Sequence, residues 1–361
     1  MLHALIMAGG AGTRFWPKSR QRTPKQLLEI AGNGTMIQQT VRRMLPSVDP
    51  SRIHVITNGS LVEATRAQLP KVPPQNVIGE PCGRDTAACI GLGALLAQRL
   101  DPKALLAVMP ADHVIEPDAS FTRALNVCVS LAEQADTLVT MGIRPTFPSV
   151  DYGYIHRGSR LGANDGVTFY QVTEFKEKPD RATAEGFVAS GEYYWNSGMF
   201  VWRADTILRC IARHMLKLHE ALTRIRPSLG TPEEARVVAE EYERLEKKSI
   251  DYGVMEPAAK AGMVKVVEAI YDWDDVGTWR AVERHRLADA AQNVVVGKHV
   301  GVDTNGCVVV GEDGHLVTTI GVSDLIVIHT KDATLVCRKD SAQDVKKLVD
   351  KLKEGGLNSY L

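Results

Sequence analysis

The 361-residue chain has no surplus of charge of either sign and no long apolar run. Lys and Arg together number 43 and Asp and Glu together number 43, so the formal net charge is +0. This balance argues against a polybasic nucleic-acid binder and against a membrane-surface protein. A membrane-spanning helix needs about 18 or more uninterrupted apolar residues, and no stretch approaches that length. We therefore expect no nucleic-acid partner and no membrane partner.

Cysteine is also sparse, and the six cysteines form no C-x-x-C pair. In a chain of this size, that pattern predicts reduced thiols rather than a disulfide framework or a structural zinc site. The apolar start, residues 2–8, is too short for the core of a secretory signal and runs directly into glycines. These absences predict a cytoplasmic protein.

Apolar runs and helical patterns alternate along the first half of the chain. The predicted strands are 3–8, 52–57, 104–109 and 138–143. The predicted helices are 36–45, 61–69, 86–100 and 121–135. Buried apolar strands separated by helices indicate βαβ units and a mostly parallel sheet, which is the α/β fold class. In such a sheet, functional loops follow the carboxyl ends of the strands.

The second half is less regular. Residues 152–154 and 168–175 predict a hairpin, and helices are predicted over 181–190 and 233–247. Residues 198–202 have an extended pattern.

The last part of the chain has a different composition. Residues 293–339 are rich in Val, Gly and Thr, and short β runs alternate there with Asn-Gly and Asp-Gly turn signals. This pattern predicts a small all-β domain, either a small barrel or a few turns of β-helix, and a final helix over 342–352. The predicted domains are therefore 1–290 and 291–361.

The strongest local signal is a glycine-rich loop at 7–14, after the first predicted strand. Its glycines let the backbone approach a phosphate, and the N–H groups of such a loop can point at the anion. The loop is not a P-loop, because G-x-x-x-x-G-K-[ST] is absent. It is not a dinucleotide fingerprint either, because Phe15 replaces the third glycine and Pro17 interrupts the helix that should follow. Arg14 and Lys25 supply two cations at its edge and favour a triphosphate ligand over a simple tight turn.

Six segments, in order, resemble the motifs of the sugar-nucleotide pyrophosphorylases, nucleotidyltransferases that act on sugar 1-phosphates. They are GGAGTRFWPKSRQRTPKQ at 9–26, EPCGRDTAA at 80–88, MPADH at 109–113, FKEKP at 175–179, WNSGMF at 195–200 and WDDVGTW at 273–279. The resemblance implies a Rossmann-like nucleotidyltransferase domain with a mixed, mostly parallel sheet, followed by a short left-handed β-helix. The segments at 80–88 and 195–200 favour GTP and mannose 1-phosphate as substrates. The implied reaction transfers GMP to mannose 1-phosphate and gives GDP-mannose and pyrophosphate.

The resemblance also implies roles for individual residues. Those implied for nucleotide binding are Ala8, Gly9, Gly10, Gly12, Thr13, Arg14, Lys25, Glu80, Pro81, Asp85 and Asp112. Those implied for binding the sugar phosphate are Gly153, Glu177, Lys178 and Asn196. The implied catalytic residues are Arg14, Lys25, Asp112, Lys178 and Asp275, of which Asp112 and Asp275 are expected to hold Mg²⁺ or another divalent cation.

The residue types suit these roles. Asp112 follows a predicted strand, and carboxylate oxygens suit Mg²⁺, which usually takes one or two protein ligands together with phosphate and water. Guanine carries hydrogen-bond donors on its Watson–Crick edge, and Glu80 and Asp85 offer acceptors. Asp85 has two alternative roles, an ion pair with Arg84 or a cap on the helix that starts near Thr86.

Three other functions stay open on the sequence alone. The first is the same reaction with another sugar 1-phosphate or with UTP, dTTP or ATP. The second is a non-catalytic sensor of nucleotide sugars, although the charged residues that catalysis needs are all present. The third is a glycosyltransferase that uses Asp272 and Asp274 as an Asp-x-Asp metal motif. The sequence leaves the oligomeric state open, and the β-rich tail is a candidate contact for a homodimer.

Overall fold

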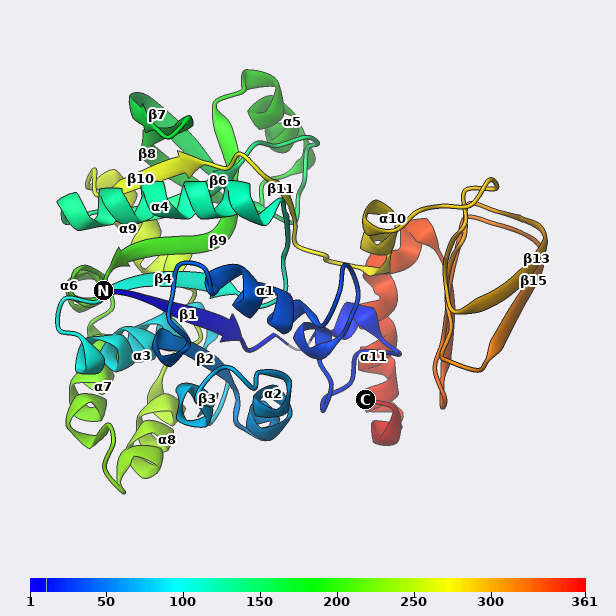
Figure 1. The fold of residues 1–361 in the computed structure, drawn as a ribbon, viewed down its shortest axis with the longest axis horizontal. Helices are drawn as coiled ribbons and strands as arrows, with labels where there is room; N and C mark the ends of the chain where they lie inside the picture. The colour runs from blue at the N-terminus through cyan, green and yellow to red at the C-terminus, as the bar shows by residue number, and fades with distance from the viewer. Residues whose placement is uncertain (11) are drawn as a thin grey trace. The chain divides into compact units, whose positions relative to one another are not determined.

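The computed structural model describes residues 1–10 and 12–361, which form two compact units (Figure 1). The first unit contains Met1–Gly9, Thr40–Pro110 and Ile115–Trp273, and the second contains Gly10–Gln39, Ala111–Val114 and Asp274–Leu361. Ala11, inside the expected glycine loop, lies outside the described residues. The predicted domain boundary near residue 290 stays a prediction.

The first unit is built on a nine-stranded mixed sheet with the order β3-β2-β1-β4-β9-β6-β10-β8-β7. The strands are β1 (Leu2–Ala8), β2 (Ile53–Asn58), β3 (Val77–Glu80), β4 (Leu105–Pro110), β6 (Leu138–Ile143), β7 (Gly153–Asn164), β8 (Val167–Glu177), β9 (Tyr193–Arg203) and β10 (Val264–Glu268). Strands β1 to β4 pair in parallel, whereas β7, β8 and β9 pair in antiparallel fashion. The α/β class and the predicted hairpin are therefore confirmed. The sequence reasoning missed β3, a four-residue strand that contains a glycine.

Helices pack around this sheet (Figure 1). They are α2 (Val62–Gln68), α3 (Asp85–Leu100), α4 (Asp118–Gln134), α5 (Arg181–Ser190), α6 (Ala204–His214), α7 (Leu216–Ile225), α8 (Glu234–Arg244) and α9 (Glu256–Lys260), while α1 (Met36–Met44) passes from the second unit into the first. A single π-helical turn, Asp251–Met255, precedes α9. The predicted helix over 233–247 is wrong at its end, because the buried residue Leu245 is extended and the chain then runs along the start of α3. In the described part of the chain, no helix is long and apolar enough to cross a membrane.

The C-terminal part of the second unit is a stack of short strands, which pair in parallel except for the last strand, which pairs antiparallel with the strand before it. They are β12 (Val294–Val296), β13 (Lys298–Asn305), β14 (Val308–Val310), β15 (Leu316–Ser323), β16 (Leu325–His329) and β17 (Thr334–Arg338). The pairs β12–β14, β14–β16 and β13–β15 are parallel, so successive turns of chain stack on one another. This pairing confirms the β-helix and excludes the small barrel. Helix α10 (Val282–His285) precedes the strands, and α11 (Val345–Glu354) follows them and packs on their core through Val345 and Val349.

Within the first unit, helix α3 lies close to β1 because a glycine stands at the contact. A Cβ added to Gly93 would lie 2.8 Å from Cδ1 and 3.0 Å from Cγ of Leu5, which is fully buried in the strand. Ordinary carbon–carbon contacts are about 3.5–4.0 Å, so the added methyl group would push the helix from the sheet.

Gly93→Ala is expected to lower the free energy of unfolding by about 1–3 kcal/mol, because overpacking against Leu5 outweighs the gain in helix propensity. The matched control is Gly186→Ala in the exposed helix α5, where a Cβ meets nothing within 4 Å. The control is expected to raise the free energy by about 0.5–1 kcal/mol. Urea unfolding of both variants measures the difference, and equal stabilisation of the two would contradict close packing of α3 on β1.

Candidate active site

Predicted nucleotide-binding residues lie together at one edge of the first unit's sheet. Strand β1 ends at Ala8 and β3 ends at Glu80, and both strands pair in parallel with β2. A Cβ added to Gly9 would lie 3.6 Å from Oε2 of Glu80. The main chain at Gly9 therefore lies next to this carboxyl group, and Pro81, which follows Glu80, is exposed.

The Glu80 carboxyl is buried without full pairing. Only 6% of the residue is exposed, and within the described part of the chain Oε1 has no hydrogen-bond partner. Burial raises the pKa of Glu80 to about 7, and the Tyr242 hydroxyl beside it offsets only part of this effect. A buried acceptor without a donor is costly. The N–H groups of a bound base would satisfy it and favour its ionised form.

The contacts at the start of helix α3 show that Asp85 binds the first turn of its helix, whereas Arg84 binds main-chain oxygens. Asp85 has a positive φ of 65°, and its Oδ1 accepts a hydrogen bond from the Thr86 N–H at 2.7 Å. Arg84 donates to the main-chain oxygens of Tyr242 and Glu243, each at 2.6 Å. Arg84 is thus engaged by the main chain, and Asp85 binds the first turn of its own helix. Direct contact between Asp85 and a base stays a prediction.

The predicted sugar-binding residues also meet within the first unit. Gly153 at the start of β7 pairs with Glu177 at the end of β8, and Asn196 lies on the neighbouring strand β9. A Cβ added to Gly153 would clash with Oε2 of Glu177 and lie 3.4 Å from Cβ of Asn196. Only glycine therefore allows these two polar side chains to approach the main chain of β7.

Lys178 follows directly after β8 and is exposed. Its φ is 45°, its side chain is 64% exposed, and its ammonium lies 3.9 Å from Oε1 of Glu177. Burial raises the pKa of Glu177, the negative charge of Asp251 adds to this effect, and Lys178 opposes it. The ammonium is thus accessible to a phosphate, while the neighbouring carboxyl is half-buried.

Asn196 is held by Asp251, a residue that sequence reasoning missed. The Asn196 Nδ2 donates to Oδ1 of Asp251 at 2.7 Å, and its Oδ1 accepts the Gly198 N–H at 3.2 Å. Asp251 opens the π-helical turn before α9. No motif marks it, and the only signal is an acidic residue near the start of the stretch 250–259, in which most residues are apolar.

One stretch of chain, residues 242–251, contacts both halves of this site, and we call it the 242–251 segment. The Ala87 N–H donates to the main-chain oxygen of Lys248 at 3.3 Å, and the Ile250 N–H donates to Oγ1 of Thr86 at 2.9 Å. The segment also provides the Tyr242 ring beside Glu80 and the Asp251 carboxylate, as given above. It therefore ties the residues next to Glu80 to those next to Asn196.

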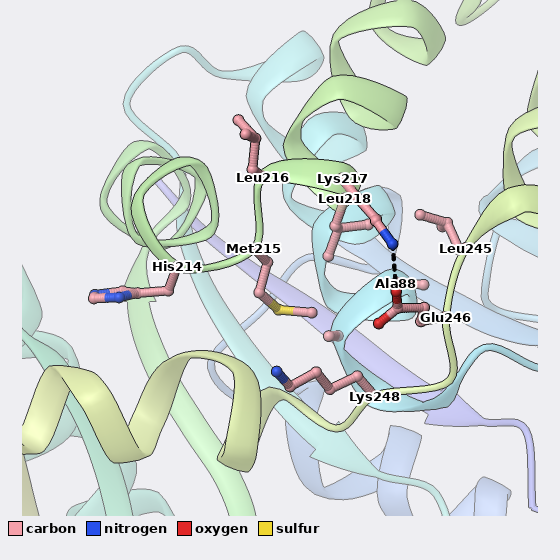
Figure 2. A pocket seen from close by; sticks show the side chains of 10 residues that line it. Ala88, His214, Met215, Leu216, Lys217, Leu218, Leu245, Glu246 and Lys248 are labelled. Atoms are coloured by element: carbon pink, nitrogen blue, oxygen red, sulfur yellow. Dashed lines mark hydrogen bonds and ion pairs between the residues drawn. The ribbon is translucent and has the colours of Figure 1, made fainter.

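The 242–251 segment also lines a pocket of about 350 Å³ (Figure 2). There, Leu245 and Lys248 lie near Ala88, opposite the turn between α6 and α7. Lys217 and Glu246 form an ion pair at 2.6 Å at this pocket. None of the residues predicted for substrate binding lines it, so this pocket is separate from the candidate active site.

In the second unit, Lys25 lies between the two predicted metal ligands. Its ammonium donates to Oδ2 of Asp112 at 2.8 Å and to the main-chain oxygen of Asp275. Burial alone would raise the pKa of Asp112, but the charges of Lys25 and His113 hold it below its usual value. The Lys25 side chain is 8% exposed and that of Asp112 is 34% exposed, so the carboxylate stays accessible.

Gly12 of the glycine loop lies close to the main chain of Lys25. Gly12 has a φ of 58°, and a Cβ there would lie 2.8 Å from the main-chain nitrogen of Lys25. Arg14 lies in the short 3₁₀ turn Thr13–Phe15 and is partly exposed, and Gly10 is exposed. The triphosphate contacts expected of these residues stay predictions.

Asp274 is occupied by ion pairs. Its carboxylate accepts hydrogen bonds from Arg284 at 2.6 and 2.7 Å, from His285 at 2.8 Å and from the Val276 N–H at 2.8 Å. Burial opposes its ionisation, but these donors hold the pKa of Asp274 well below its usual range. Asp274 therefore anchors the turn that carries Asp275 and does not form half of an Asp-x-Asp metal site.

This fold and these motifs define a nucleotidyltransferase, and the chain belongs to the nucleotidyl transferase family. The model of that family matches residues 3–292, and a model described as a MannoseP isomerase/GMP-like β-helix domain matches residues 297–352. These matches confirm the family expected from the motifs.

The similar proteins carry one recurring name. The chain is 39% identical to the mannose-1-phosphate guanylyltransferase of Escherichia coli strain K12, over 99% of this chain and 75% of that protein. It is 40% identical to the mannose-1-phosphate guanylyltransferase ManC of Salmonella typhimurium strain LT2, with the same two coverages. A crystal structure described as a mannose-1-phosphate geranyltransferase from Thermus thermophilus matches with a TM-score of 0.87 and 38% identity, over 98% of this chain and 99% of that one.

Glu80→Gln is expected to stabilise the protein at pH 8 by roughly 1–3 kcal/mol and to leave its stability unchanged at pH 4. The pKa of Glu80 is raised from 4.5 to about 7 in the folded state. At pH 4 the Glu80 carboxyl is mainly protonated in both the folded and the unfolded protein. Above pH 4.5 it ionises in the unfolded protein but stays protonated in the folded protein. The wild type therefore loses stability as the pH rises to about 7. Glutamine is neutral at every pH.

Urea unfolding at pH 4 and pH 8 measures this difference. Glu133→Gln, at an exposed position on α4, is the control and should shift stability equally at both values. If the effect of Glu80→Gln on stability were also independent of pH, the statement that burial raises the pKa of Glu80 would be wrong.

Proposed function

We propose that this chain transfers GMP from GTP to mannose 1-phosphate, releasing pyrophosphate and forming GDP-mannose. The observation that carries the proposal is the 39% identity over 99% of the chain to an enzyme named mannose-1-phosphate guanylyltransferase. The geometry of the described residues supports it: each unit contains charged or polar groups of the kinds that one part of the reaction needs.

The reaction joins two anions. An oxygen of the mannose 1-phosphate attacks the α-phosphorus of GTP, a new P–O bond forms, and the P–O bond to the pyrophosphate breaks. Such a displacement needs positioning and charge neutralisation more than covalent participation by the protein. The cations Arg14, Lys25 and Lys178 are the residues assigned to these phosphates.

The first unit supplies recognition of the base and the sugar. Ionised Glu80 accepts hydrogen bonds from the guanine N–H groups, and Asp85 and main-chain oxygens near Pro81 offer further acceptors. Glu177 and Asn196 bind mannose hydroxyls, and the exposed Lys178 binds the phosphate of the sugar.

The second unit supplies the cations that bind the triphosphate, Arg14 and Lys25. Lys25 and Arg14 bind the triphosphate and stabilise the negative charge that develops on the departing pyrophosphate. The contact between Gly12 and Lys25 fixes the loop on the lysine main chain. The Lys25 ammonium is held by groups of the protein itself, Asp112 and the main chain of Asp275.

Asp112 and Asp275 fit a divalent cation by the chemistry of their donors. The described residues contain no group of three or more His, Cys, Asp or Glu side chains arranged for a metal ion. Mg²⁺ does not need such a group, because one or two carboxylates together with phosphate oxygens and water suffice. Asp112 already binds a cationic group, the ammonium of Lys25. Bound by these carboxylates, Mg²⁺ would neutralise phosphate charge during the displacement.

A panel of nucleotides and sugars tests the proposed function. The protein is incubated with each of GTP, UTP, dTTP and ATP, paired with mannose 1-phosphate or glucose 1-phosphate, in the presence of Mg²⁺. Pyrophosphate release is expected to be fastest for GTP with mannose 1-phosphate. A clear preference for another pair would replace the proposed substrates, and release from none would refute the enzyme assignment.

Asp112→Asn and Asp275→Asn are each expected to lower kcat by at least about 100-fold, because the reaction loses one anionic ligand for the cation that neutralises the phosphates. Asparagine keeps an acceptor for Lys25, so a buried lysine is not left without a partner. Thermal unfolding confirms that each variant is folded.

Asp272→Asn is the matched control, since Asp272 is exposed and lies three residues before Asp275. Its kcat is expected to stay within about threefold of the wild type. Near-normal turnover of Asp275→Asn would show that the second carboxylate is assigned wrongly.

A further inference from the structure

The Asn196 amide can bind a sugar hydroxyl in a defined way only if the amide cannot rotate. An amide group presents a donor on one side and an acceptor on the other, and rotation about the last bond exchanges them. A site that must distinguish one hydroxyl orientation from another therefore needs a fixed amide.

Two hydrogen bonds fix the amide of Asn196. Its Nδ2 donates to Oδ1 of Asp251 at 2.7 Å, which only a donor can do, and its Oδ1 accepts the Gly198 N–H at 3.2 Å, which only an acceptor can do. Rotation would place the amide oxygen against the Asp251 carboxylate. The second Nδ2 hydrogen and the second lone pair of Oδ1 stay available to a ligand.

The position of Asp251 suits a support for Asn196. It opens the π-helical turn Asp251–Met255, a geometry that often occurs at functional sites. The preceding residue Ile250 is tied to the first turn of α3 through its N–H and the Thr86 hydroxyl at 2.9 Å. Asp251 therefore follows directly after a residue that is tied to the start of α3.

We propose that Asp251 is a positioning residue that sets the sugar specificity of the site by fixing the Asn196 amide. The inference rests on the proposed function. Asp251 acts through Asn196, so its loss is expected to affect the sugar phosphate and to leave the use of GTP unchanged.

Steady-state kinetics of Asp251→Leu and Asp251→Asn test this role. Leucine has a similar size and no acceptor, so Asp251→Leu is expected to raise KM for mannose 1-phosphate about 10- to 100-fold, with KM for GTP within about twofold of the wild type. It should also reduce the preference for mannose 1-phosphate over glucose 1-phosphate. Asp251→Asn keeps an acceptor oxygen and is expected to stay within about threefold. The control is Glu256→Gln in the adjacent helix α9, which removes the carboxylate that pairs with Lys260. It should change neither KM for mannose 1-phosphate nor KM for GTP.

A double-mutant cycle separates positioning from other effects. If Asp251 acts only through Asn196, the double variant Asp251→Leu/Asn196→Ala should be no worse than Asn196→Ala alone. The proposal would be overturned if the double variant raised KM for mannose 1-phosphate by the product of the two single effects. It would also be overturned if Asp251→Leu raised KM for GTP as much as KM for mannose 1-phosphate.

A second route does not depend on the folding of Asp251→Leu. Asn196→Asp places a second carboxylate against that of Asp251, so the two repel each other and KM for the sugar phosphate should rise. The double variant Asn196→Asp/Asp251→Asn again pairs a donor with an acceptor, with the two groups exchanged. Partial recovery of KM supports the proposal, and no recovery overturns it. A wild type that makes no GDP-mannose refutes the proposed function instead, so the two failures are distinguishable.

Discussion

The ion pair between Lys25 and Asp112 is the interaction on which the proposed chemistry depends. It holds the Lys25 ammonium in a largely buried position, at a distance of 2.8 Å from the Asp112 carboxylate. A cation that is already fixed need not be reorganised when the negative charge of a phosphate arrives, which is the main advantage of a preorganised site. The close contact of Gly12 with the Lys25 main chain and the anchoring of the Asp275 turn by Asp274 support the same arrangement.

The first unit contains the residues to which the proposed function assigns the base and the sugar phosphate. Parallel strands place Gly9 beside Glu80, and antiparallel strands place Glu177 beside Asn196. The 242–251 segment connects these two places, because its Ile250 binds Thr86 at the start of α3 and its Asp251 binds Asn196. In the proposed function, one stretch of chain thus supports both the residues assigned to the base and those assigned to the sugar.

Much of the fold was predictable from the sequence, because strongly periodic segments bury one face or both. The apolar run 138–143 is strand β6, and the pattern over 181–190 is helix α5, each without a shift. The short strand β3 was missed because four residues carry too little pattern, and the end of α8 was misplaced because tertiary contacts extend Leu245. In the site, motifs pointed to charged residues with direct roles. Asp251 has no motif, since its role follows from a contact between residues 55 positions apart in sequence.

The central claim is that the sugar phosphate attacks the α-phosphorus directly and that the protein contributes charge and position rather than a covalent bond. The stereochemical course of the reaction tests it most directly. GTP with sulfur at one defined α-phosphate position is converted with mannose 1-phosphate, and the configuration of the thio-substituted GDP-mannose is determined. A single in-line displacement predicts inversion at phosphorus. Retention would require two displacements through a nucleotidyl-protein intermediate and would contradict this account.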